Sequence, residues 1–348
     1  MGSSFPNLSK QGPAFGAVEK AISALVLYLF FSVYLFWGHF SQLAGYQLLY
    51  VVNPVAAAWG AYSLSKRWVN NWTPSLIAGA VYGFSAFSLS FGGSHQPISG
   101  FSYVMVPWLL LPSVYWHKNA PPDAFRFTIR TIFVILPFGA ICLMFWTAAQ
   151  KWAGPHFLMP ATTRLTSQHF LDLIFPLFQK GSYLTFGLYH GAIILSLMGL
   201  LVLVKAQRIA VLIPIAVGLV LCFWEPVFEV SPIVWAAFPI LFLAILSGLG
   251  FQSLLWAGKA DCKWIITCAI AASILAAFFA GLAYKRLILG GLLEWTAMMY
   301  AIAAAALWFL FFLAKTGLRW HPMRWMLLTA AVTIDLVFSA RYLVDKLF

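Results

Sequence analysis

Charged side chains are scarce in this chain, because Asp, Glu, Lys and Arg together make up only 9% of its 348 residues. Soluble domains carry roughly 25% charged residues, so the composition excludes an ordinary water-soluble fold. Hydrophobic residues make up 62% of the sequence, and the mean hydropathy is +0.88. Such a composition is typical of a chain that crosses a lipid bilayer repeatedly.

Cysteine is also sparse, and its four positions form neither a CxxC motif nor a Cys/His spacing typical of metal ligands. We interpret Cys142, Cys222, Cys262 and Cys268 as small apolar side chains. The sequence has no Walker loop, GxSxG motif or dinucleotide fingerprint. It therefore names no cofactor and no metal, and a divalent cation is expected only if the protein is catalytic.

Long apolar runs dominate the sequence instead. A spanning helix needs roughly 20 apolar residues, and by this criterion there are about eleven candidate spans. They cover 21–37, 47–64, 76–91, 101–115, 131–148, 187–204, 209–224, 233–256, 264–283, 295–313 and 325–343. The runs are continuously apolar, whereas barrel strands alternate, so we predict an all-α integral membrane bundle.

The chain offers no segment suited to a soluble domain. We expect residues 1–20 to be a cytoplasmic tail without a signal-peptide pattern, and residues 21–348 to form a single integral membrane domain. The longest gap between spans, 149–186, is expected on the outer side. A loop of this length is usually functional or packs over the bundle.

Lys and Arg fall mostly in every second gap between the runs, which indicates orientation. With a cytoplasmic N-terminus, each inner segment carries at least two basic residues, whereas outer loops 38–46, 92–100 and 225–232 carry none. We therefore predict a multi-pass protein of the bacterial inner membrane. Topology explains the net charge of +12, so membrane lipids and not nucleic acid are the expected partners.

Few ionisable residues remain as candidates for chemistry. Asp335 lies about ten residues into the last span, near mid-bilayer, where an acid either has a function or bonds to a neighbouring helix. On the outer side, Asp172, Glu225 and Glu229 could hold a cation or act as acid and base, or Glu225 and Glu229 could be solvated helix caps. His95 follows two glycines in GGSHQP and is a further candidate.

Three stretches, 53–116, 171–204 and 229–255, carry a resemblance to a known family. They include GFSAFSLSFGGSHQPISGFSYVMVPWLLLP, LDLIFP and SPIVWAAFPILFLAILSGLG. In this order they resemble the membrane core of YfhO-like proteins, which belong with the GT-C-type glycosyltransferases. The resemblance implies an enzyme that moves a sugar from a polyprenyl-phosphate carrier to an acceptor outside the cytoplasm. Lys180 or Arg164 would then hold the carrier phosphate.

The chain departs from that family in two places. Its first outer loop, 38–46, has no carboxylate where the family keeps a catalytic Asp, and 233–235 lacks the expected basic residue. We therefore predict a non-catalytic GT-C-like subunit or assembly factor that associates with other integral membrane subunits. An active transferase that uses a polyprenyl-phosphate-sugar, and a transporter, remain as alternatives.

Overall fold

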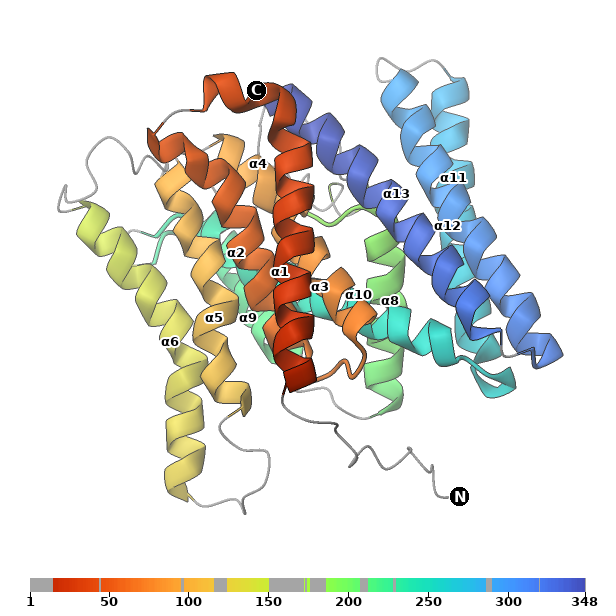
Figure 1. Ribbon diagram of the computed structural model, residues 1–348, viewed down its shortest axis with the longest axis horizontal. Coiled ribbons are helices and arrows are strands. Elements are labelled where there is room, and N and C mark those ends of the chain that lie inside the picture. The colour runs from red at the N-terminus through yellow and green to blue at the C-terminus, as the bar shows by residue number, and fades with distance from the viewer. Residues whose placement is uncertain are drawn as a thin grey trace.

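The computed structural model describes residues 15–43, 45–94, 97–115, 124–149, 172, 174–175, 186–206, 212–227, 230–285, 290–318 and 320–347. Within these residues the regular elements are helices (Figure 1). Eight helical stretches are long and apolar enough to cross a membrane. The prediction of an all-helical, multi-pass membrane protein is confirmed, while the exact number of spans and the GT-C-like core stay predictions.

Each predicted apolar range contains a described helix. The longer helices are α1 (Phe15–Phe36), α6 (Ala124–Ala149), α10 (Ala237–Trp256), α11 (Cys262–Tyr284), α12 (Gly290–Thr316) and α13 (His321–Leu347). The shorter ones are α2 (Leu49–Ser65), α3 (Trp72–Gly83), α4 (Ala86–Ser94), α5 (Phe101–Tyr115), α8 (His190–Lys205) and α9 (Leu212–Phe223).

Most of the described basic residues lie at one end of the bundle. Here the Trp72 indole donates to the Lys20 carbonyl at 2.9 Å, and Arg324 donates to the Ala257 carbonyl at 2.6 Å. These bonds bring together the starts of α1, α3 and α13 and the end of α10. We call this the basic end, because it carries Lys20, Lys66, Arg67, Lys205, Lys259, Lys263, Lys315 and Arg324.

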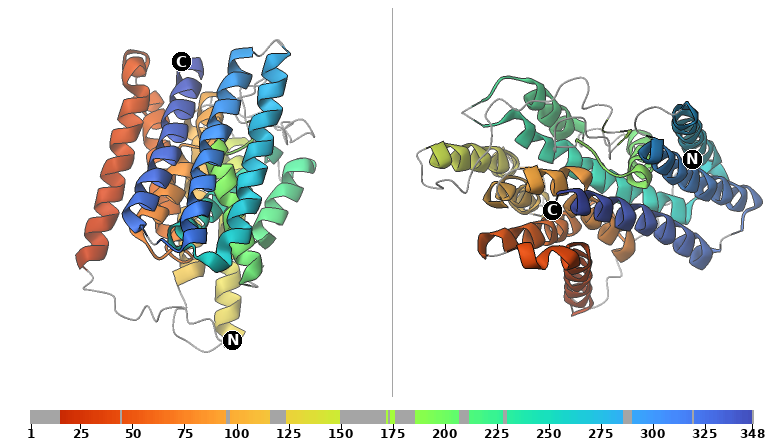
Figure 2. Two further views of the ribbon diagram at one scale, coloured as in Figure 1. Left: turned by 90° about the vertical axis from the view of Figure 1, so that its right-hand side faces the viewer. Right: turned by 90° about the horizontal axis from the view of Figure 1, so that it is seen from above.

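The opposite end holds the C-terminus of the chain (Figures 1 and 2). Asp345 near the end of α13 lies 2.9 Å from His39 Nε2 and accepts a bond from Arg341 Nε at 2.9 Å. Arg341 also donates to the Leu35 carbonyl at 2.8 Å. The first and last helices are therefore joined at this end.

Helix α10 forms the centre of the packing, and most of its residues are buried. Its glycines allow neighbouring helices to approach closely, because a Cβ at Gly250 would collide with the Leu195 carbonyl of α8. A Cβ at Gly248 would lie 2.7 Å from the Pro74 carbonyl of α3. The SGLGFQS stretch, residues 247–253, is therefore a close-packing surface. Helices α1, α6 and α11 are mostly exposed and apolar, as lipid-facing helices are.

Two helices are interrupted within the depth of the bundle. α3 ends at Gly83 and α4 begins at Ala86, and α8 has only 16 residues. At 1.5 Å per residue, α8 covers about 24 Å from the basic end, which is short of a ~30 Å hydrocarbon core. The two interruptions meet where the Phe87 N–H donates to the Gly187 carbonyl at 3.3 Å. Irregular backbone at this depth requires protein cover, and Phe84, Ser85 and Tyr189 are buried.

Candidate functional site: a buried Asp–His centre

Asp335 lies in the interior of α13 and is only 4% exposed. At 1.5 Å per residue it lies about 21 Å from the start of α13, near the middle of the membrane depth. Its Oδ1 is 2.9 Å from Nδ1 of His190 and accepts a bond from Ser339 at 3.2 Å. Its Oδ2 accepts the N–H of Gly191 at 2.7 Å. Both carboxylate oxygens are therefore bonded to the protein.

The position of Asp335 at the start of α8 has a physical cause. The first N–H groups of a helix lack intrahelical acceptors and carry a partial positive charge, which favours a carboxylate. Tyr189, the residue before α8, makes no side-chain capping bond. Asp335 supplies the cap from another helix, and Gly191 leaves room for it, because a Cβ there would lie 3.3 Å from Oδ2.

His190 is fully buried and is the other half of the centre. With Asp335 as a carboxylate, Nδ1 is the donor, and in the tautomer that carries its proton there Nε2 is an acceptor. Among the residues that the structure describes, Nε2 has no hydrogen-bond partner. The ring lies edge-on to Tyr300 of α12, with centroids 5.1 Å apart, and Tyr300 donates to the Ile174 carbonyl at 2.7 Å.

In this centre a carboxylate orients the His190 ring and leaves the second ring nitrogen available for a hydrogen bond. Thr296, one turn before Tyr300 on α12, is also buried, and its hydroxyl has no partner among the described residues. Across the described ranges, no group of three His, Cys, Asp or Glu residues is placed to hold a metal ion.

Asp172, a predicted catalytic residue in the 149–186 loop, is buried at 6% exposure. Its Oδ2 accepts the N–H of Phe186 at 3.1 Å. Burial raises the pKa of the Asp172 carboxyl to about 7, although the bond from Phe186 opposes this shift. Asp172 and Asp335 therefore hold the two ends of the short segment 186–191, which leads into α8.

Of the other predicted site residues, the structure describes Glu225. Glu225 follows α9 and is exposed. Glu229, His95, Lys180 and Arg164 lie outside the described residues, so their catalytic and phosphate-binding roles stay predictions.

The sequence alone does not identify His190 as the partner of Asp335. The only local signal is a lone His in LYHG at the beginning of an apolar run. Arg324 counts toward the orientation of the chain as the other basic residues do, yet it is buried and donates to the Ala257 and Leu318 carbonyls. These roles depend on residues far away in the chain.

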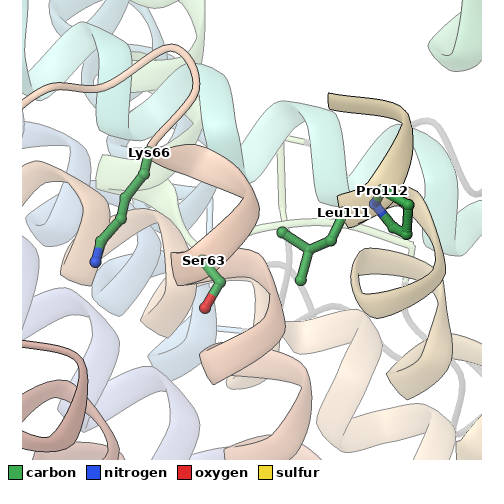
Figure 3. A pocket seen from close by; sticks show the side chains of 4 residues that line it. All are labelled: Ser63, Lys66, Leu111 and Pro112. Atoms are coloured by element: carbon green, nitrogen blue, oxygen red, sulfur yellow. The ribbon is translucent and has the colours of Figure 1, made fainter. Parts of the chain in front are cut away.

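A hollow of about 380 Å³ lies between α2 and α5 at the basic end, lined by Ser63, Lys66, Leu111 and Pro112 (Figure 3). The Lys66 ammonium lies 4.3 Å from the Tyr62 ring centroid. Partial burial, and to a smaller extent the charge of Lys20, lower the pKa of Lys66. Because the Lys66 ammonium lies over the Tyr62 ring, this hollow is a weak candidate for catalysis.

Comparison of the chain with known protein families, with curated proteins and with solved structures finds no match in any of the three. The fold and the Asp–His centre are therefore the basis for a proposed function.

Proposed function

We propose that this chain is a non-catalytic GT-C-like integral membrane protein that serves as a subunit or assembly factor of a larger membrane complex. One observation carries the proposal: Asp172 and Asp335 both accept backbone N–H groups of the segment 186–191. A catalytic carboxylate has to reach its substrate, whereas these two are buried and bonded within the protein. Their role in this arrangement is to stabilise irregular backbone.

The first outer loop supports the same proposal. In the resembling enzymes this loop holds the catalytic acid, but here residues Trp37–Gln42 form a short 3-10 helix without a carboxylate. His39 of this helix contacts Asp345. His39 thus joins this loop, at the end of α1, to α13.

The proposal is tested by whether the protein, extracted in mild detergent, is part of a larger complex. Blue native electrophoresis should show a discrete species that is heavier than the 38.7 kDa chain and its detergent, and in-cell crosslinking should recover the same partners. Asp172→Asn and Glu225→Gln form a matched pair, one buried and one exposed. Both should enter the complex and leave transfer of sugars to envelope glycans unchanged. A uniform monomer without crosslinked partners would contradict the proposal.

An active GT-C-type glycosyltransferase is a second candidate, because a carboxyl pKa near 7 suits a general base. In this case Asp172 would deprotonate the acceptor, and Lys180 or Arg164 would hold the carrier phosphate. Vesicles supplied with a radiolabelled polyprenyl-phosphate-sugar should then show transfer that Asp172→Asn abolishes and Asp345→Asn does not. Absence of transfer by the unaltered protein would remove this candidate.

A transporter is a third candidate, favoured by the start of α8 within the depth of the bundle and by the interruption between α3 and α4. Discontinuous helices with an ionisable residue at mid-membrane are typical of secondary transporters. Solute uptake into proteoliposomes that Asp335→Asn abolishes would support this function. Equal uptake by the unaltered protein and the variant would contradict it.

A further inference from the structure

A groove of about 420 Å³ lies at the basic end, where α3 and α13 begin and α10 ends. It is lined by Asn71, Trp72, Thr73, Pro74, Leu255, Trp256, His321, Pro322 and Trp325. Its walls are joined to one another, because the Trp325 indole donates to the Thr73 hydroxyl at 3.2 Å. The Trp256 and His321 rings are 4.5 Å apart. The groove is thus built by three helices that are distant in sequence.

The tryptophans indicate the depth at which the groove opens. Trp256 is 62% exposed and Trp325 is 42% exposed, and both lie at helix ends. Exposed tryptophans at the ends of spanning helices are typical of the lipid headgroup region, where the ring contacts apolar chains and the N–H contacts polar groups. The groove therefore opens at the level of the headgroups.

The surroundings of the groove are positively charged. Lys20 borders the groove through its backbone, since its carbonyl accepts the Trp72 indole N–H. Besides burial, the charge of Lys20 lowers the pKa of Lys66, so both ammonium groups contribute to the positive field of the basic end. The described acids at this end are Glu19 and Asp261, and Asp261 is already paired with Lys205 at 3.3 Å. The N-terminal ends of α3 and α13 add partial positive charge.

We propose that this groove binds the headgroup of an anionic phospholipid. The phosphate would lie beside the starts of α3 and α13, and the acyl chains would follow the exposed faces of Trp256 and Trp325. A lipid suits the groove better than a free anion, because much of the lining is apolar and aromatic. This inference is independent of the proposed function, because it concerns the opposite end of the bundle from Asp172 and Asp345.

Native mass spectrometry of the purified full-length protein tests the inference. The unaltered protein, titrated with phosphatidylglycerol, should retain it in preference to phosphatidylcholine. Lys20→Gln should weaken this retention about fivefold, the size expected for one basic side chain near an anionic headgroup. Trp256→Leu and His321→Gln should weaken it as well. Trp37→Leu is the matched control, because Trp37 is 73% exposed at the opposite end of α1.

Thermal unfolding in detergent checks that each variant is folded, and only variants with an unchanged midpoint are compared. Equal retention of the anionic and zwitterionic lipids by the unaltered protein would overturn the proposal. So would unchanged phosphatidylglycerol retention in all three groove variants. Displacement of the lipid by inorganic phosphate at the same concentration would assign the groove to a free anion instead.

Discussion

The backbone N–H of Gly191 donates to Oδ2 of Asp335 at 2.7 Å, across 144 positions of the chain. The bond places a carboxylate of α13 on the first turn of α8, where the helix has no cap of its own. Hydrogen bonds from His190 and Ser339 occupy the other oxygen. The last helix thereby fixes the depth at which α8 begins.

Asp335→Ala should destabilise the protein strongly, since it removes the cap of α8 and leaves His190 buried without a partner. Each buried donor that loses its acceptor, one at His190 and one at Gly191, costs roughly 1–3 kcal/mol. Asp335→Asn should cost less, because an amide oxygen still accepts the Gly191 N–H. Denaturant unfolding in mixed micelles measures the difference. The matched control is Asp345→Ala on the same helix, at an exposed pair worth about 1 kcal/mol or less.

Gly250→Ala should disturb the contact between α8 and α10, because the added methyl group meets the Leu195 carbonyl. Overpacking of this kind costs roughly 1–3 kcal/mol. Gly281→Ala in α11 is the control, since a Cβ there has nothing within 4 Å. The thermal midpoint of the Gly250→Ala variant should therefore be lower than that of the unaltered protein, whereas that of Gly281→Ala should be unchanged. Equal midpoints would show that the helices are less closely packed than described.

Asp172 should make stability depend on pH. Its folded pKa, raised by burial to about 7 from an ordinary value of 3.8, means that the folded state holds the proton more tightly than the unfolded state. This contribution is fully present below pH ~4 and is lost as the pH rises through ~7. As the pH rises from ~4 to ~7, the thermal midpoint of the unaltered protein should therefore decrease relative to that of Asp172→Asn. Glu225→Gln, at an exposed carboxylate, should leave the profile unchanged.

The basic end should face the cytoplasm. Single cysteines at Lys66 and at Asp345, in a chain whose native cysteines are replaced by alanine, place the two ends on opposite sides. A membrane-impermeant maleimide added to intact cells should label the cysteine at 345 directly, and the one at 66 only after permeabilisation. The reverse pattern would contradict the orientation inferred from Lys and Arg.

Much of the helical architecture follows from local composition. A continuously apolar run in lipid can satisfy its backbone only as a helix, so every predicted run from 21–37 to 325–343 contains one. The mid-depth position of Asp335 also followed from counting residues along its span. The break between α3 and α4 did not, because VYGFSAFSLS carries no charged residue and no proline.

The candidate site depended on contacts that no local pattern encodes. The sequence by itself determined that the chain crosses the membrane repeatedly and that one acid lies within the bilayer, because hydropathy and charge spacing are local properties. Only the tertiary structure decided that Asp335 meets His190 and Gly191 and that Asp172 turns inward to Phe186. The reason is physical: an uncapped helix start and a buried carboxylate satisfy each other only when packing brings distant segments together.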